Sequence, residues 1–359
     1  MKLIVQIPAL NERETIAAVI AEIPRSLPGV SRVEVLIIDD GSNDDTVAVA
    51  LAAGADHIVR HTANKGLANA YQTGIDTALR LGADLIVNTD ADNQYPGSEI
   101  PNLVRPIIEG RADIVVGDRQ VQNLEHFSPL KKGLQHLGSS VVRWASETDV
   151  PDTVSGFRAL SREAALRTFV TTDFSYTVEA LIQAGKRRLT VVAVPISTNY
   201  VERPSRLHRG NWNFIKRQAA IIARTYATYE PLKVFSYLAI AFFIPGFLLL
   251  ARAAYVFIGR RVEVVSADNL QALVVGGILV LMALITFLIG LLADLVGGVR
   301  RVQQELLYRV RTMQVEDDAW RRTATARLDA LETVLPIPED LYLTSKPPSP
   351  GGTTDPRQG

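Results

Sequence analysis

Two aspartates, Asp90 and Asp92, stand one residue apart directly after an apolar run, within the stretch NTDADNQYPG of residues 88–97. Two carboxylates held close together without a cation repel each other and raise each other's pKa. Asp92 and Gln94 carry oxygen ligands of the type that Mg²⁺ and Mn²⁺ prefer, and substrate phosphates can complete such a site. The pattern predicts a divalent metal site that holds a nucleoside diphosphate. An acidic turn without a ligand is the alternative.

Polar clusters also follow three other apolar runs: PALNE at 8–12, DDGS at 39–42 and NKG at 64–66. Ligands of parallel sheets bind beyond the carboxyl ends of the strands, so four such clusters favour a nucleotide site. Asp40 could accept a hydrogen bond from a base N–H, and Glu12 could reach a ribose hydroxyl. Taken singly, Asn11 could instead cap a helix and Asp40 could form a turn. The chain has no Gly-x-x-x-x-Gly-Lys-Ser/Thr sequence, which argues against a P-loop nucleotidase.

The elements that would position these clusters alternate between strand and helix. We expect helices such as 12–23 and 67–82 between strands at residues 3–7, 33–39, 57–60, 84–89 and 113–117. Alternation at this spacing predicts an α/β fold with a parallel sheet covered on both faces.

Composition limits the function classes. Lys plus Arg and Asp plus Glu number 38 each among 359 residues, so no overall charge favours a nucleic-acid partner. The absence of cysteine excludes disulfides, thiolate metal sites and cysteine nucleophiles. The start, MKLIVQIPALNE, lacks the pattern of a signal peptide, and we expect the N-terminal domain to stay in the cytoplasm.

Two long apolar stretches, 234–258 and 270–299, change the character of the chain after its first two-thirds. Each exceeds the roughly 20 residues that a helix needs to cross a bilayer. We expect two transmembrane helices, with Pro245-Gly246 kinking the first and glycines 276, 277 and 290 allowing close packing in the second. A pair of buried core helices is the alternative.

The flanking charges predict the orientation of these spans. Residues 203–233 carry seven Lys or Arg against the single acid Glu230, and Arg300 and Arg301 follow the second span. The positive-inside rule places both termini in the cytoplasm and the loop 259–269 outside, as in an integral protein of the cell membrane if the source is bacterial.

The remaining segments are predicted from pattern alone. The segment 203–233 has an apolar stripe and basic residues, which favours an amphipathic helix on the membrane surface over an ordinary packed helix. Residues 300–335 are expected to be helical, with a short coiled coil or homo-oligomer contact as one role, and 336–359 to be disordered.

The motifs PALNE, DDGSNDDT, NKGLANAYQTGI and DADNQYP together resemble family 2 glycosyltransferases of the GT-A fold. More narrowly, the chain resembles polyprenyl-phosphate glycosyltransferases, which include dolichol-phosphate mannose synthases and the bacterial enzymes that charge undecaprenyl phosphate. The resemblance covers residues 1 to about 230 and, as two spans, continues to about 300. It implies a GT-A domain over 1–202 with a Rossmann-like, mostly parallel sheet.

The resemblance also implies roles for individual residues. Asp90 and Asp92 would act in catalysis, and Asp92 and Gln94 would be direct ligands of Mg²⁺ or Mn²⁺. The implied nucleotide contacts are Pro8, Asn11, Glu12, Asp40, Lys65 and Asp90.

The segment DTVSGFR at 152–158 resembles the lining of the sugar and acceptor region, with Ser155 and a catalytic Arg158. A structural salt bridge is the alternative role for Arg158. Arg119, Ser155, Arg203, Ser205 and Arg206 resemble positions that receive phosphate oxygens in this group. Arginine suits this role because its planar guanidinium binds phosphate in a bidentate manner. Attraction to the membrane surface is a second role open to Arg203 and Arg206.

These features predict an inverting enzyme that moves a sugar from a UDP- or GDP-sugar to a polyprenyl phosphate at the cytoplasmic leaflet. A phosphate dianion is already nucleophilic and needs no general base. The Gln-x-x-Arg-Trp motif of processive synthases is absent, because Ser140 precedes the only Arg-Trp, at 143–144. Two alternatives remain: a glycolipid synthase with a hydroxyl acceptor such as diacylglycerol and Asp152 or Glu179 as base, and a scaffold without turnover.

Overall fold

The structure is a computed structural model of the chain, and it describes residues 1–120, 142–143, 146–170, 176–199, 226–227, 230–260 and 267–334. The candidates Arg203, Ser205 and Arg206 lie outside these residues, as do most of the basic segment 203–233 and the whole tail 336–359.

A seven-stranded sheet forms the centre of the N-terminal domain, in the order β3-β2-β1-β4-β6-β5-β7. Neighbouring strands are parallel except β6, which is antiparallel to β4 and β5. The strands are β1 (Lys2–Ala9), β2 (Arg32–Asp39), β3 (His57–Arg60), β4 (Leu85–Asn88), β5 (Ile114–Asp118), β6 (Arg158–Ser161) and β7 (Val191–Pro195). All five predicted strands are present, and β6 and β7 are additional.

Helices cover both faces of the sheet because successive side chains of β1 and β2 point to opposite sides. Leu3, Val5 and Ile7 join one buried cluster, whereas Ile4, Leu36 and Ile38 join the other. The first cluster packs against α1 (Ile16–Glu22), α2 (Thr46–Ala52) and α4 (Ile100–Ile108), which follows the short η1 (Gly97–Glu99). The second packs against α3 (Leu67–Arg80), α6 (Arg162–Arg167) and α7 (Tyr176–Lys186).

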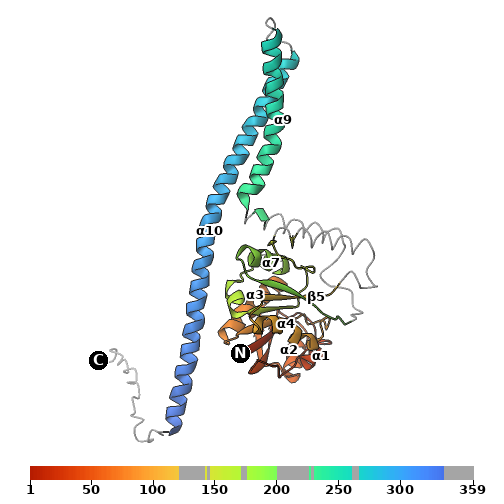
Figure 1. Cartoon of the computed structure of the whole chain (residues 1–359). Coiled ribbons are helices and arrows are strands. Elements are labelled where there is room, and N and C mark those ends of the chain that lie inside the picture. The colour runs from red at the N-terminus through yellow and green to blue at the C-terminus, as the bar shows by residue number, and fades with distance from the viewer. Residues whose placement is uncertain are drawn as a thin grey trace, which may run out of the picture.

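Two long helices follow the domain and pack against each other, α9 (Pro231–Arg260) and α10 (Ala267–Val334) (Figure 1). By length and composition both could cross a membrane. The predicted spans 234–258 and 270–299 lie inside them, and α9 continues through Pro245. The segment 300–335 was expected to be helical, and up to Val334 it is part of the same helix as the second apolar stretch, because α10 runs unbroken for 68 residues.

Three glycines allow α9 and α10 to approach closely. A side chain at Gly246 would place its Cβ 2.8 Å from the Cβ of Leu279, and one at Gly276 would place it 3.0 Å from the carbonyl oxygen of Gly246. Gly290 likewise faces Phe235, at 2.5 Å from the Cβ of that residue. Gly277, predicted to serve the same packing, faces open space.

Candidate active site

The carboxyl ends of β1, β2 and β4 lie next to one another in the sheet. Ala9 pairs with Asp39 at the ends of β1 and β2, while Gln6 of β1 pairs with Asn88 at the end of β4. The Thr15 hydroxyl donates to the carbonyl oxygen of Ala91 at 2.7 Å, which joins the loop after β1 to the loop after β4. Three of the predicted polar clusters therefore meet at one edge, as parallel pairing requires.

The loop after β1 binds the turn after β2. Asn11 has a φ of 54°, a left-handed conformation that asparagine tolerates better than most residues. Its backbone N–H donates to the Ser42 hydroxyl at 2.9 Å, and its side-chain oxygen accepts from the Asn43 N–H at 2.9 Å. The Glu12 N–H donates to the Thr46 hydroxyl at 2.9 Å. Asn11 thus fixes the relative position of two predicted nucleotide-binding loops, and Pro8 lies buried in β1 just before them.

Asp40 holds the loop that follows β3. Its carboxylate accepts from His61 Nδ1 at 2.7 Å and from the backbone N–H groups of Lys65 and Gly66, each at 2.9 Å. His61 also contacts the Thr73 hydroxyl of α3 through Nε2 at 3.1 Å. The structure therefore brings Asp40 and Lys65 together, with the Lys65 side chain exposed. The sequence did not lead us to predict this role of His61, although its position directly after β3 places it at the strand ends where the site was expected.

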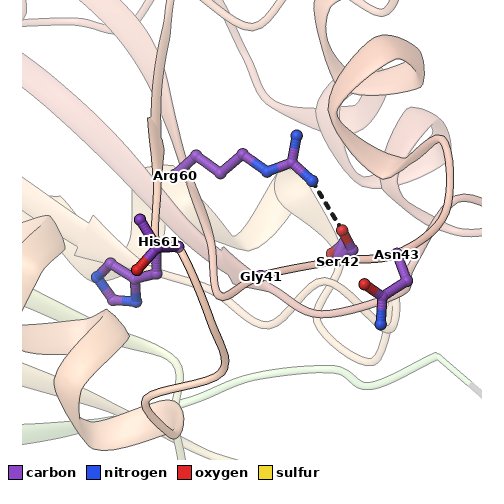
Figure 2. Close-up of a pocket in the computed structure, with 6 residues that line it drawn as sticks. Gly41, Ser42, Asn43, Arg60 and His61 are labelled. Atoms are coloured by element: carbon purple, nitrogen blue, oxygen red, sulfur yellow. Dashed lines mark hydrogen bonds between the residues drawn. The ribbon is translucent and has the colours of Figure 1, made fainter.

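An open hollow of about 230 Å³ lies beside this loop, between the ends of β2 and β3 (Figure 2). Arg60 reaches across it, and its Nη2 donates to the carbonyl oxygen of Ser42 at 2.9 Å. Gly41 has a φ of 82°, and a Cβ there would lie 2.8 Å from the backbone of Ala63. The hollow is lined by Gly41, Ser42, Asn43, Arg60, His61 and Thr62.

The loop after β4 carries the two predicted acids. Burial, and then the charge of Asp92, raise the pKa of Asp90 to about 7, with Arg119 partly offsetting the rise. Asp92 accepts the N–H of Gln94 through Oδ1 at 3.0 Å. Asn199, beyond β7, donates its backbone N–H to the Gln94 carbonyl oxygen at 2.9 Å. The loop is thus tied from both sides while its acids stay partly accessible.

This donor set fits a hard divalent cation. Among the described residues, no three His, Asp or Glu side chains gather into a cluster that could hold a metal alone. Mg²⁺ usually takes only one or two protein carboxylates and fills its other positions with water and substrate phosphates. A cation held by Asp92 and Gln94 would offset the repulsion from Asp92, which is the second cause, after burial, of the raised pKa of Asp90.

A buried network of polar groups lies next to Asp90. The amide nitrogen of Asn88 donates to the Gly156 carbonyl oxygen at 2.8 Å and to the Tyr176 hydroxyl at 2.9 Å, while its oxygen accepts from Gln6 at 2.9 Å. A Cβ at Gly156 would lie 3.0 Å from Asp90 Oδ2 and 2.9 Å from the Tyr176 hydroxyl. Glycine at 156 therefore makes room for the carboxylate. Asn88 and Tyr176 were not predicted, because only the folded sheet places them together.

Arg158 points into the protein from β6 and is only 1% exposed. Its guanidinium donates to three backbone carbonyl oxygens: Ser155 at 2.9 Å, Thr177 at 2.7 Å and Thr153 at 2.9 Å. These bonds fix the segment 153–155 against the start of α7. The geometry favours positioning of the segment that contains Ser155, itself fully buried, over direct contact with a substrate.

Arg119, just past β5, pairs with Asp152 through two bonds. Nε contacts Oδ2 at 2.6 Å and Nη2 contacts Oδ1 at 3.0 Å. The pair is mostly buried and occupies both oxygens of Asp152, one of the two residues considered as a base. The other, Glu179, is buried in α7 and accepts from Gln183 at 3.2 Å.

The model of glycosyl transferase family 2 matches residues 4–169 of the chain. A UDP-N-acetylglucosamine–dolichyl-phosphate N-acetylglucosaminyltransferase of Methanococcus voltae is 32% identical over 218 residues, which cover 55% of this chain and 85% of that protein. The chain belongs to glycosyltransferase family 2, and its mixed sheet is of the GT-A type.

One relative is similar over a longer part of the chain, which includes the apolar helices. Glycosyltransferase AglJ of Haloferax volcanii is 29% identical over 310 residues, which cover 83% of this chain and 94% of that protein. Among solved structures, glucosyl-3-phosphoglycerate synthase of Mycobacterium tuberculosis with Mn²⁺, UDP and phosphoglyceric acid aligns with a TM-score of 0.49 and 22% identity. That alignment covers 63% of this chain and 77% of that one. Several relatives at about 30% identity are named as polyprenyl-phosphate glycosyltransferases, so the chain is related to that group.

Proposed function

We propose that this protein transfers a sugar from a nucleotide sugar to a polyprenyl phosphate, with inversion at the anomeric carbon. The observation that carries the proposal is the acidic pair Asp90 and Asp92 at the meeting strand ends, in a chain that continues into two exposed apolar helices. Transfer to a dolichyl phosphate by the Methanococcus voltae relative supports the choice of acceptor. The proposal includes a division of the chain into a GT-A domain at 1–202, two membrane spans at 234–258 and 270–299, and a cytoplasmic segment at 300–335.

The exposure of the two helices supports their place in a bilayer. Only 11% and 17% of the residues in their most apolar windows are buried within the protein. A core helix of a soluble protein would be mostly buried, and exposed apolar surface of this extent is stable in lipid but not in water. We place the catalytic domain on the cytoplasmic side, because basic residues dominate the chain on that side of both spans.

In the proposed reaction, an oxygen of the acceptor phosphate forms a bond to the anomeric carbon while the bond from that carbon to the donor diphosphate breaks. The nucleoside diphosphate leaves with the electron pair, and no proton must be removed from a phosphate dianion. A bound Mg²⁺ or Mn²⁺ would supply Lewis-acid stabilisation of the leaving diphosphate.

The residues of the chain bind and orient the reactants. Asp92 and Gln94 would hold the cation, and Gly156, held by Asn88, leaves room for the Asp90 carboxylate. Glu12, Asp40 and Lys65 are assigned to the nucleotide. Arg203, Ser205 and Arg206 are assigned to phosphate oxygens, since each such charge-assisted bond is stronger than a neutral one.

The test uses the full chain in vesicles with Mg²⁺ or Mn²⁺, a polyprenyl phosphate and a panel of UDP- and GDP-sugars. Mass spectrometry should detect one lipid-linked sugar, and Asp92→Asn should lower its rate by about a hundredfold or more, as loss of a metal ligand does. Asp45→Asn, on the exposed start of α2, is the matched control and should keep the rate. Product formed equally well by Asp92→Asn would refute the site assignment.

A further inference from the structure

Beyond its apolar stretch, α10 runs along the side of the catalytic domain (Figure 1), and residues 308–322 contact α3 and α6. Val315 is 4% exposed and belongs to the buried cluster that covers one face of the sheet. The Tyr308 hydroxyl donates to the Glu163 carboxylate at 3.0 Å, and the Arg167 guanidinium lies 4.3 Å from the centre of the Tyr308 ring. A helix that contributes to a core in this way is a structural part of the domain.

Arg311 is the strongest anchor of this contact and is 8% exposed. Its guanidinium donates to the carbonyl oxygens of Thr168 at 2.8 Å and Leu166 at 3.2 Å, and it pairs with Asp76 of α3. A buried guanidinium with three acceptors is costly to remove, because the acceptors are left without a donor. Arg322 adds a further bond to the carbonyl oxygen of Arg80.

The segment that Arg311 holds is joined to the helices around the site. The backbone N–H of Phe169 donates to the side-chain oxygen of Gln183 in α7, and the side-chain nitrogen of Gln183 donates to the carbonyl oxygen of Phe169. The Val170 N–H donates to the side-chain oxygen of Gln72 in α3 at 2.9 Å. The first residue of α7, Tyr176, contacts Asn88 beneath Asp90. α10 is therefore fixed to the same helical layer that supports the active site.

The opposite face of α10 makes no comparable contact among the described residues. Val310, Met313 and Trp320 are 47%, 65% and 69% exposed. The helix runs without a break from the apolar stretch to this docking region, and about 12 residues separate Val299 from Arg311, or about 18 Å at 1.5 Å per residue.

We propose that α10 is a rigid strut that sets the height and tilt of the active site above the bilayer, with Arg311 and Val315 as its positioning residues. The inference rests on the proposed membrane function. Because one continuous helix is both a membrane span and part of the catalytic domain, the domain cannot rise or turn freely relative to the lipid. Such fixation holds the sugar donor at the depth where the phosphate of the acceptor lies, which supplies proximity without any contact to substrate.

A cross-link tests the docking itself and needs no enzymatic activity. The chain has no cysteine, so the pair Arg80→Cys and Arg322→Cys can be joined by a short bismaleimide in vesicles without background. We expect cross-linking of this pair with full retention of transfer, and no cross-linking of the control pair Arg80→Cys and Trp320→Cys. Absence of the first cross-link, or loss of transfer when it forms, would overturn the strut.

Acceptor dependence tests the positioning role. Arg311→Ala should lower kcat/KM about tenfold or more for a long polyprenyl phosphate in vesicles, while a short-chain, water-soluble polyprenyl phosphate loses less than about twofold. Met313→Ala, on the opposite face, should change neither value. Equal losses for both acceptors would mean local damage to the domain, and no loss would mean that α10 does not position it; either result contradicts the strut. Failure of the wild-type protein with every donor would refute the proposed function and leave the cross-linking result standing.

Discussion

At the scale of the residue, the proposed function depends on Asp90, a carboxylate whose ionised form the fold destabilises. The pKa of Asp90 is raised to about 7 by burial and by Asp92, so metal-free protein is destabilised once this carboxylate ionises. Groups with such raised pKa values concentrate at functional sites, where a ligand supplies the missing charge.

Replacing Asp90 should therefore separate stability from function. In the unfolded chain Asp90 titrates near 3.8, so between about pH 4 and 7 the folded wild type binds the extra proton and its stability falls as pH rises. Asp90→Asn avoids this loss, and with EDTA at pH 8 it should raise the free energy of unfolding by up to about 4 kcal/mol. The difference should vanish near pH 4.

Thermal or urea unfolding across this pH range checks the prediction, and sugar transfer by Asp90→Asn should be abolished. Asp84→Asn, at an exposed position before β4, serves as the control. A less stable Asp90→Asn protein at pH 8 would contradict the assigned role of burial and repulsion.

Arg158 provides the second prediction at this scale. Arg158→Met keeps an unbranched apolar stem but removes the donors to three buried carbonyl oxygens, so the free energy of unfolding should fall by about 2–4 kcal/mol. Arg105→Met, at an exposed position of α4, should change it by less than about 0.5 kcal/mol. Unchanged stability with lost activity would instead indicate the substrate contact that the motif suggested.

At the scale of the element, the glycines of the α9–α10 pair set how closely the helices pack. Gly276→Leu would force a side chain against the Gly246 carbonyl oxygen and the Leu250 side chain, both about 3.0 Å from the Cβ position, and separate the two helices. We expect faster trypsin cleavage between them and a lower midpoint of thermal unfolding in detergent. Gly277→Leu, which faces open space, is the neighbouring control, and equal effects of both changes would contradict the packing.

Most of the sheet could be predicted from local patterns. The strands β1 to β5 are apolar runs, and the polar clusters at their ends mark the edge where the site forms. β6 could not be found in this way, because it has four residues, begins with a buried arginine and is defined by pairing with β4 and β5. The change in composition at residue 300 was visible in the sequence, but the continuity of α10 and its packing at Val315 depend on the folded domain.

The site residues also differ in whether the sequence alone could predict them. The types and spacing of Asp90, Asp92 and Gln94 were informative because all three belong to one loop. The pair Arg119 and Asp152 joins residues 33 positions apart, and the bond from Asn88 to Tyr176 spans 88. Contacts of this kind depend on the topology of the sheet, which no local pattern contains.

At the scale of the whole molecule, the chain combines a family 2 catalytic domain with two apolar helices, and α10 belongs to both parts. This arrangement suits a reaction between a soluble donor and an acceptor whose reactive group lies at the surface of a bilayer. The proposed chemistry also explains why the two carboxylates considered as general bases, Asp152 and Glu179, are both buried and hydrogen-bonded. A phosphate acceptor requires neither of them.

The central claim is tested most directly by comparing two acceptors that differ only in the head group. The full chain in vesicles would receive the preferred nucleotide sugar and either a polyprenyl phosphate or the corresponding polyprenol, with transfer measured by mass spectrometry. We predict transfer to the phosphate and at least a thousandfold slower transfer to the alcohol, roughly 4 kcal/mol in the activation barrier, because both carboxylates considered as bases, Asp152 and Glu179, are buried and hydrogen-bonded. Efficient transfer to the polyprenol, or to diacylglycerol in place of the phosphate, would contradict the account.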